Sequence, residues 1–258
     1  MRKKVLCAVA VYNESFNLPN LFKDVEDQAL ADYVDFVFID DFSTDHSVSL
    51  IQNAGYEVLS QPEKGGYGGA VKMGMRLASE RGYQYMVLFP GDHQRQANDV
   101  KKLISLALKT NHDVIVGSKF HIYSEFYKGS IGRKFGNKLY SNFAKFFWNS
   151  SISDVLSGFK IYKVARTHAI MEVVPQGYPL DIVFSLYASR QKLIMSEIPV
   201  NCRYDQNTTK MKSIALVSMN MMLHLLTHLF YFEFLNRRKL QMALEDTRTV
   251  ATRIEKVL

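Results

Sequence analysis

The sequence predicts an α/β protein with a mostly parallel sheet flanked by helices, followed by an amphipathic helical extension. Two observations carry this prediction: short apolar runs alternate with segments of helical period, and a polar cluster follows each of the first four apolar runs. At 258 residues and 47% hydrophobic content, the chain can bury a substantial core. We therefore expect a folded domain rather than a disordered chain.

Apolar runs mark the strands of the first half, and helical segments lie between them. The runs cover residues 5–12, 34–40, 56–60, 83–89 and 113–118. The helical segments cover residues 17–30, 43–55, 70–82 and 97–111. Gly55 and Gly82 close two of these helices, because glycine readily adopts the left-handed conformation that ends many helices. The alternation is typical of parallel strands joined by helical crossovers.

The second half is less regular. A basic, aromatic-rich helix is expected at 131–149, a turn into a strand at 154–163, a helix at 178–193 and a last strand at 195–204. A stretch without formal charge follows at 213–232. We divide the chain accordingly into an α/β domain at 1–212 and a C-terminal helical segment at 213–258.

The uncharged stretch at 213–232 is long enough to cross a bilayer. Its polar side chains nevertheless repeat at helical spacing, which predicts an amphipathic helix lying in a membrane interface. Packing on the protein's own domain or on another subunit is the alternative. The polar residues are Asn220, His224, Thr227, His228 and Tyr231, and the flanking basic residues are Lys210, Lys212, Arg237, Arg238 and Lys239.

The polar clusters predict one site at one edge of the sheet. They are YNES at 12–15, DDFSTD at 40–45, KGGYGG at 64–69 and PGDHQ at 90–94. Each lies at or shortly after the end of a predicted strand, and ligands of such sheets bind beyond the carboxyl ends of the strands.

Charge and cysteine content narrow the partners and the compartment. A formal charge of +7 is compatible with nucleic acid, anionic lipid or phosphorylated substrates. Nucleic acid is the weakest of these, because the basic residues are scattered among carboxylates and no binding module is present. Cys7 and Cys202 lie far apart without metal-ligand spacing, so we expect neither a disulfide framework nor a zinc site. The short apolar run at the start of the chain lacks a signal-peptide pattern, and a reducing, cytosolic setting fits best.

An ordered set of motifs resembles the family-2 glycosyltransferases with a GT-A fold. Within that family, the sequence most resembles the branch of polyprenyl-phosphate and dolichyl-phosphate sugar synthases. The resemblance covers about residues 4–212, and its motifs are specific as a set although each is weak alone. They are VAVYNES, VFIDDFSTD, GYGGAVKMG, PGDHQ, VGSKF, DVLSGFKIYK and SEIPVNCRY.

The resemblance implies a nucleotide pocket formed by the first two loops. Tyr12 and Glu14 would line it, and Asp40 and Asp41 would contact the base and ribose. Ionised carboxylates suit that task because they accept strong hydrogen bonds from N–H and hydroxyl groups. A purely structural alternative is that Ser43 or Thr44 caps the following helix.

The resemblance also implies a divalent metal, Mg²⁺ or Mn²⁺, after the fourth strand. The family pattern there is Asp-x-Asp-x-Gln, and this chain has Pro90 in place of the first Asp. Asp92 and Gln94 remain as ligands and Gly91 as a substrate-binding position, because one carboxylate with substrate phosphates can hold a hard cation. We expect a weakened metal site. Asp92 as an ordinary turn residue is the alternative.

The implied reaction is inverting sugar transfer from a nucleotide-diphosphate sugar to a lipid phosphate. Lys119 and Arg133 would hold the acceptor phosphate, and Arg203 and Lys210 match the family pattern only loosely. A phosphate monoester, with a second pKa of roughly 6, needs no general base near neutral pH. These expectations place the protein in the cytoplasm, peripheral at the cytoplasmic face of a membrane, as a possible homo-oligomer that does not bind nucleic acid.

Two alternatives stay open at this point. The acceptor could be a sugar hydroxyl of a glycolipid or surface-polysaccharide intermediate, with Asp181 as the base, although an Asp near a helix start is more often a partner of the helix dipole. Alternatively, the substitution at Pro90 could leave a nucleotide-sugar-binding protein without turnover.

Overall fold

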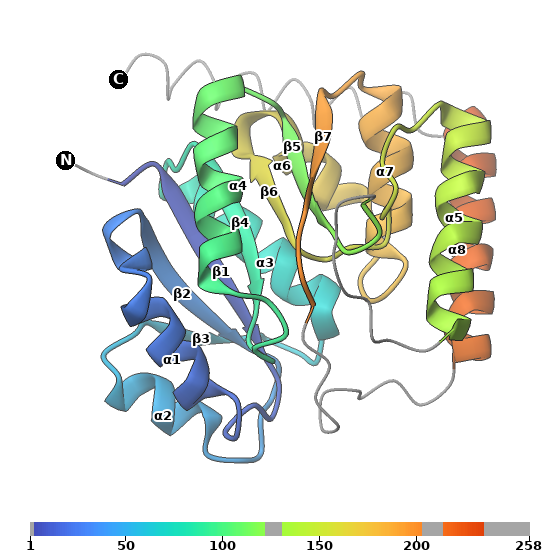
Figure 1. Cartoon of the computed structure of the whole chain (residues 1–258). Coiled ribbons are helices and arrows are strands. Elements are labelled where there is room, and N and C mark those ends of the chain that lie inside the picture. The colour runs from blue at the N-terminus through green and yellow to red at the C-terminus, as the bar shows by residue number, and fades with distance from the viewer. Residues whose placement is uncertain (1–2, 122–130, 203–213, 235–258) are drawn as a thin grey trace.

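A computed structural model describes residues 3–121, 131–202 and 214–234; within these ranges, the side chains at 131–133, 214–215 and 231–234 are not described. Seven strands form one sheet in the order β3-β2-β1-β4-β6-β5-β7 (Figure 1). Every pairing is parallel except those of β6, which runs antiparallel to both neighbours. The predicted mostly parallel sheet is confirmed. The strands are β1 Val5–Val11, β2 Val34–Asp40, β3 Val58–Ser60, β4 Tyr85–Pro90, β5 Val114–Ser118, β6 Lys160–Lys163 and β7 Met195–Pro199.

Helices cover both faces of the sheet. They are α1 Leu18–Asp27, the 3-10 helix η1 Leu30–Asp32, α2 Ser47–Asn53, α3 Gly66–Glu80, α4 Ala97–Thr110, α5 Ile131–Trp148, α6 Val164–Val173, α7 Leu180–Arg190 and α8 Ile214–Phe234. Gly55 and Gly82 have φ of 79° and 68°, as their predicted place at helix ends requires. Helix α6 was not predicted, because it follows β6 without a capping side chain and carries buried residues on several sides.

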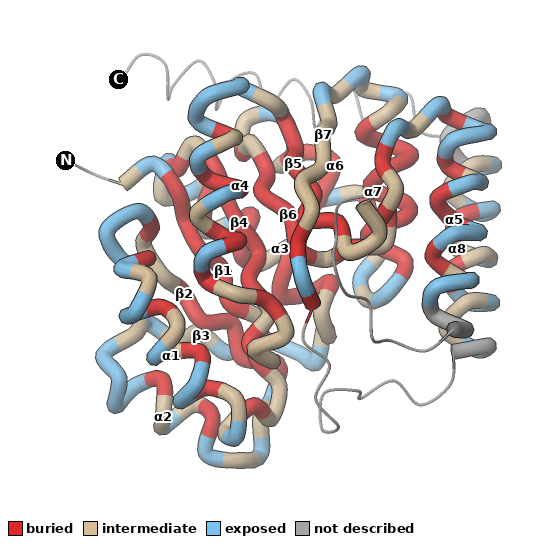
Figure 2. The backbone as a smooth tube through the Cα atoms, in the orientation of Figure 1, coloured by how far each residue is buried: buried red, intermediate tan, exposed pale blue. Residues whose placement is uncertain are grey.

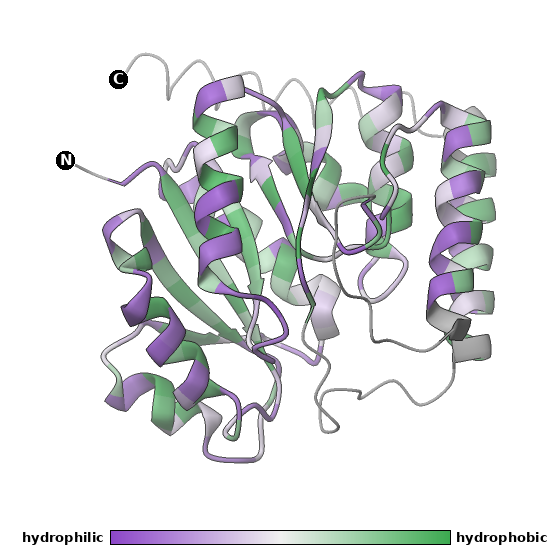
Figure 3. Ribbon diagram, in the orientation of Figure 1, coloured by the Kyte–Doolittle hydropathy of each residue, from purple (hydrophilic) through white to green (hydrophobic). Residues whose placement is uncertain are grey.

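The alternation of side chains along β1 divides the core into two layers. Val5 and Val9 pack with α1, α2 and α4, whereas Leu6 and Ala8 pack with α3, α6 and α7 on the other face. The central strands are apolar nearly throughout and buried on both faces (Figures 2 and 3). Because helices cover both faces, the sheet reaches solvent at its strand ends and along its edge strands β3 and β7.

The first turn of α2 differs from its predicted form. Neither Ser43 nor Thr44 caps the helix, which begins at Ser47. Asp45 instead accepts hydrogen bonds from the Ser47 N–H at 2.9 Å and the Ser15 N–H at 3.0 Å. Burial alone would raise the pKa of Asp45, but hydrogen bonds from Ser47 and Ser15 outweigh it and lower the pKa to about 2.

Helix α8 packs against α5 and α7. Met221 and Leu225 are buried in this contact, and the Tyr187 hydroxyl lies 3.2 Å from His228 Nδ1. Asn220 and Thr227, two residues of the predicted polar stripe, are exposed. Leu223 and Phe230 are exposed as well, so α8 carries apolar side chains on its outer side in addition to its packed side. No helix within the described ranges is long and apolar enough to span a membrane.

Candidate active site

Hydrogen bonds join the loops after β1 and β2 at the carboxyl edge of the sheet. The Asn13 N–H donates to Ser43 Oγ at 2.9 Å, and Asn13 Oδ1 accepts from the Thr44 N–H at 2.7 Å. Asn13 adopts a φ of 53°, a left-handed conformation that asparagine tolerates better than most residues. The Glu14 N–H reaches Ser47 Oγ at 2.8 Å. The two loops therefore form one unit.

The two predicted carboxylates after β2 are both buried, and they do different work. Asp40 accepts from the Ser43 N–H and shapes its own loop. Asp41 Oδ1 accepts from the N–H groups of Gly65 and Gly66, at 2.9 and 3.0 Å, and from Gln61 Nε2 at 3.0 Å. Asp41 thus holds the turn that begins α3, a role that its sequence position alone did not indicate.

Tyr12 and Glu14 lie at the same edge. Lys64 Nζ donates to the Tyr12 hydroxyl at 2.9 Å and lies 4.1 Å from the centre of its ring. Glu14 is buried and accepts from Asn17 Nδ2 at 2.6 Å, so its carboxylate points toward the start of α1. The edge location agrees with the predicted nucleotide pocket, and the individual roles of Tyr12 and Glu14 stay predictions.

The segment after β4 is held tightly by β1. The Gly91 N–H donates to the Ala10 carbonyl at 2.9 Å, and a Cβ at Gly91 would lie only 2.8 Å from that oxygen. Glycine is therefore required there by space. The next residue, Asp92, accepts from the Gln94 N–H at 3.1 Å, and Gln94 Oε1 accepts from Cys202 Sγ at 3.5 Å.

This donor set fits a hard cation that a substrate completes. Asp92 is the one carboxylate of the PGDHQ segment, and no group of three potential metal-ligating side chains exists among the described residues. A cation such as Mg²⁺ is commonly held by one or two carboxylates together with substrate phosphates. The hydrogen bond from the Cys202 thiol is weak, so the amide oxygen of Gln94 can turn toward a ligand. The imidazole ring of His93 lies near α1, where its Nε2 is 3.8 Å from Asp24 Oδ2.

A buried arginine that was not predicted ties the same segment to the end of β7. Arg95 lies in the core, where its guanidinium donates to the Asn201 carbonyl at 3.2 Å and stacks over Phe159 at 5.6 Å. Strand β1 and the segment after β7, which are far apart in sequence, therefore both hold the Asp92 segment.

Lys119 follows β5 at the same edge of the sheet. Its N–H donates to Asp154 Oδ2 at 3.2 Å, and its Nζ lies 5.3 Å from the centre of the Phe120 ring. No carboxylate among the described residues forms an ion pair with Lys119. Only β6 separates β4 from β5, which puts the two strand ends about 10 Å apart at the usual spacing.

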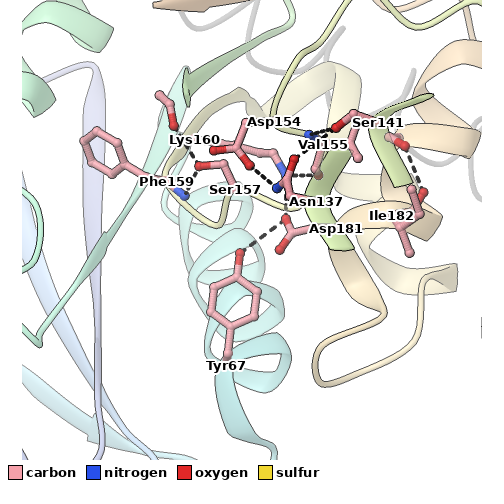
Figure 4. A network of polar contacts seen from close by, with 12 residues as sticks. Tyr67, Asn137, Ser141, Asp154, Val155, Ser157, Phe159, Lys160, Asp181 and Ile182 are labelled. Atoms are coloured by element: carbon pink, nitrogen blue, oxygen red, sulfur yellow. Dashed lines mark hydrogen bonds and ion pairs between the residues drawn. The ribbon is translucent and has the colours of Figure 1, made fainter. Parts of the chain in front are cut away.

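Asp181 at the start of α7 belongs to a buried network beneath this edge (Figure 4). Its Oδ1 accepts from Lys160 Nζ at 2.5 Å and from the Tyr67 hydroxyl at 3.3 Å. Burial raises the pKa of Asp181, and Lys160 and Tyr67 act against that rise. Burial, reinforced by the nearby Asp181 charge, also holds the pKa of Tyr67 well above its ordinary value. The base role of Asp181 stays a prediction.

A second branch of the network centres on Asp154 (Figure 4). Asp154 is buried and accepts from Asn137 Nδ2 at 2.5 Å, and Asn137 Oδ1 accepts from Ser141 Oγ at 3.1 Å. Asp154 and Lys160 both lie in the DVLSGFKIYK segment, but no role was predicted for either residue, because their partners lie on distant elements. Together they fasten α5 and α7 to the sheet.

The side chains of three predicted substrate-binding residues fall outside the described part of the structure. The backbone at Arg133 belongs to the first turn of α5, but its side chain is not described. Arg203 and Lys210 fall outside the described residues. Their roles stay predictions.

Comparison with protein families agrees with this geometry. A family model described as glycosyl transferase family 2 matches residues 7–168. That range contains the loops after β1 to β5 and the whole of β6.

Individual proteins resemble the chain in sequence or in fold. A UDP-N-acetylglucosamine–dolichyl-phosphate N-acetylglucosaminyltransferase of Methanococcus voltae is 20% identical, with 79% of this chain and 87% of that protein covered. Glucosyl-3-phosphoglycerate synthase of Mycobacterium tuberculosis, in complex with phosphoglyceric acid, has a similar fold: the TM-score is 0.68 at 16% identity, covering 88% and 80% of the chains. Its complex with Mn²⁺, UDP and glucosyl-3-phosphoglycerate gives 0.66 at 17% identity, with the same coverage.

Proposed function

The chain belongs to glycosyl transferase family 2 and is an enzyme, and we propose that it transfers a sugar from a UDP-sugar to a polyprenyl phosphate with inversion at the anomeric carbon. The donor part is supported by the loops after β1 to β4, which offer Tyr12, Asp40 and Asp41 at one edge. The similar proteins named for a UDP-sugar or bound to UDP support the choice of nucleotide.

The acceptor part rests on one observation, which is that Asp92 and Lys119 follow two strands, β4 and β5, that only β6 separates. A carboxylate suited to a cation, Asp92, follows β4, and Lys119, whose ammonium has no ion-pair partner among the described residues, follows β5. About 10 Å between the strand ends leaves room for a sugar ring between a donor diphosphate and an acceptor phosphate. The dolichyl-phosphate transferase among the similar proteins supports a lipid on that phosphate.

The reaction requires little acid–base chemistry from the protein. An oxygen of the acceptor phosphate bonds to the anomeric carbon while the bond to the nucleotide oxygen breaks, and the nucleoside diphosphate leaves with the electron pair. Mg²⁺ or Mn²⁺, when bound, would offset charge on that leaving group. Asp92, with Gln94, would hold the cation, and Lys119 and Arg133 would orient the acceptor.

The hydroxyl-acceptor alternative needs a base, and the geometry of Asp181 does not favour it. The Asp181 carboxylate is buried and paired with Lys160, so it is not directed at the open edge of the sheet. Family membership likewise disfavours a binding protein without turnover. We therefore keep lipid phosphate as the proposed acceptor.

The proposed lipid acceptor implies work at a bilayer. We place the protein at the cytoplasmic face of a membrane, held by the segment 213–258, with the domain 1–212 carrying catalysis. Self-association through the same segment is the competing arrangement.

A donor and acceptor screen tests this function. Calorimetric binding of UDP- and GDP-sugars with and without Mn²⁺ identifies the donor, and transfer is then measured to polyprenyl phosphate, to a glycolipid hydroxyl and to phosphoglycerate. We expect metal-dependent binding of a UDP-sugar and transfer only to the polyprenyl phosphate. Transfer confined to a hydroxyl acceptor would contradict the proposed acceptor, and full activity with excess chelator would contradict the metal.

A matched pair of lysines separates donor from acceptor binding. Lys119→Ala should raise the acceptor KM by about ten- to a hundredfold, since a charged hydrogen bond contributes about 1.5–3 kcal/mol. Lys64→Ala should instead weaken nucleotide-sugar binding, because Lys64 contacts Tyr12. Arg133→Ala should behave like Lys119→Ala. Equal loss of both affinities in either position would show a structural role.

A further inference from the structure

Helices α5 and α8 lie together at one edge of the molecule (Figure 1). The Tyr140 hydroxyl of α5 donates to the Ser218 carbonyl of α8 at 2.6 Å. Ala144 of α5 and Leu225 of α8 are fully buried, so each helix turns one side to the core. The opposite sides face solvent.

Those outer sides are apolar, which is unusual for helices that face water. Phe146 is 83% exposed, Phe230 73% and Phe135 71%. Large exposed apolar patches on soluble domains mark interaction surfaces. We name this surface the α5–α8 face; it consists of Phe135, Leu139, Phe146 and Phe147 of α5 and Leu216, Met219, Leu223, Leu226 and Phe230 of α8.

A lysine-lined pocket borders the α5–α8 face. Lys134, Lys138 and Lys145 lie on one side of α5, between its buried side and the exposed Phe135 and Phe146. They line a cavity of about 680 Å³ together with asparagine and serine side chains of α5 and of residues 149–153. Within the described part of the chain, none of the three lysines forms an ion pair with a carboxylate.

We infer that the α5–α8 face docks on an anionic bilayer and that the lysine-lined pocket receives the phosphate of a lipid headgroup. Charge complementarity favours this occupant, because the apolar side chains would enter the headgroup region while the neighbouring lysines meet anionic phosphate. A second copy of the chain fits less well, since a contact between two such faces would bring the same lysines into one interface. The inference rests on the proposed lipid acceptor, for which it supplies the orientation of the enzyme.

Membrane contact was predicted from the sequence only for the uncharged stretch at 213–232, which supplies most of α8. Helix α5 adds a second, basic element to this surface. Lys134, Lys138 and Lys145 have long aliphatic stems that can lie along apolar surface while their ammonium groups reach phosphate. The helix that carries them also carries Asn137, whose bond to Asp154 fixes it to the loop beside Lys119. Docking through α5 would thus place the acceptor end of the candidate site next to the bilayer.

Vesicle flotation of the full chain tests this docking. Vesicles are made of phosphatidylcholine alone or of equal parts phosphatidylcholine and phosphatidylglycerol. We expect binding only to the anionic vesicles, with loss at high salt. Each lysine near an anionic surface contributes roughly fivefold in partitioning, so a variant with Lys134→Gln, Lys138→Gln and Lys145→Gln should bind about a hundredfold more weakly.

The matched control removes the same charge from the edge of the sheet where parallel strands begin, away from the α5–α8 face. Lys4, Lys109 and Lys192 are exposed where strands begin, and their triple Gln variant should bind like wild type. A separate Phe135→Ser and Phe146→Ser variant should also lose binding, because it removes apolar insertion without changing charge. Circular dichroism confirms that each variant is folded.

Three outcomes would overturn the inference. The first is equal weakening by both lysine triples, which would show a general charge effect. The second is unchanged binding in either α5 variant. The third is a stable dimer in sedimentation that Phe135→Ser and Phe146→Ser dissociate, with no vesicle binding, which would assign the face to a second copy. The proposed function is tested separately, since wild type should transfer sugar to a water-soluble, short-chain prenyl phosphate without vesicles.

Discussion

The carboxyl edge of the sheet and the α5–α8 face are built in opposite ways. At the edge, carboxylates such as Asp41 are buried and held by backbone N–H groups. On the α5–α8 face, phenylalanines stand exposed beside lysines without described ionic partners. The first arrangement fixes donors and acceptors for a small polar ligand, and the second suits a large, deformable surface.

Glycines show the same contrast. A Cβ at Gly68 of α3 would lie 2.9 Å from the Gln176 carbonyl carbon and would collide with the backbone of Gly177. A Cβ at Gly136 of α5 would meet nothing within 4 Å. Packing is therefore tight where α3 supports the candidate site and open on α5.

The largest effect is expected from breaking the buried pair of Lys160 and Asp181. Lys160→Met should lower the free energy of unfolding by about 3–5 kcal/mol, because it leaves a buried carboxylate without its cation. Urea denaturation measures the change. The exposed pair of Arg76 and Glu172, also joined by hydrogen bonds, is the control, and Arg76→Met should cost about 1 kcal/mol or less. Similar losses in both variants would show that burial of the pair does not matter.

Removing the carboxylate of Asp92 should affect catalysis rather than folding. Asp92→Asn is expected to lower kcat/KM about a thousandfold, because a bound cation contributes several kcal/mol to stabilising the leaving group. Its thermal unfolding should match wild type. Asp32→Asn, at an exposed position in η1, should retain full activity. A fully active Asp92→Asn enzyme would make Asp92 a turn residue.

The two glycines allow the difference in packing to be sharpened. Gly68→Ala should destabilise the protein by about 1–3 kcal/mol through overpacking against backbone. Gly136→Ala should stabilise it by about 0.5–1 kcal/mol, since alanine is the better helix former and open space receives its methyl group. Paired urea titrations give both values, and a shared sign would end the contrast.

The smallest effect concerns Asp45 and acid pH. Its pKa in the fold is about 2 against an ordinary 3.8, so its stabilising contribution is present above pH 3.8 and disappears as the pH falls toward 2. Because Asp45 is only partly buried and solvent screens its charge, we discount the shift to roughly 1 kcal/mol. Asp45→Asn should lose that stability at neutral pH, and its free energy of unfolding should decline less steeply between pH 4 and pH 2. Thermal unfolding at several pH values measures both effects. An unchanged acid limb would place the main acid-labile carboxylate elsewhere.

Periodicity and turn chemistry were sufficient to predict the strands, the helix-ending glycines and the sheet edge at which the loops of the candidate site lie. These features depend on residues near one another in sequence. The antiparallel course of β6, the clamp of Asp41 on the turn before α3 and the pairing of Lys160 with Asp181 depend on partners far along the chain. Neither spacing nor composition specifies such partners. Helix α6 was missed for a local reason, since it lacks both a cap and a single apolar stripe.

The position of β6 in the sheet has a consequence for the order of folding. Strands β1, β2, β3 and β4 are neighbours in the sheet and come from the first 90 residues, so they can pair as soon as these leave the ribosome. Strand β6 inserts between β4 and β5 only after α5 has been synthesised, and β7 pairs with β5 later still. Contacts of long sequence separation form slowly, and nascent chains begin to fold from the N-terminal end. During synthesis, the sheet of β1 to β4 would therefore expose one edge of β4 until β6 arrives, and in that interval a chaperone would have a strand to protect.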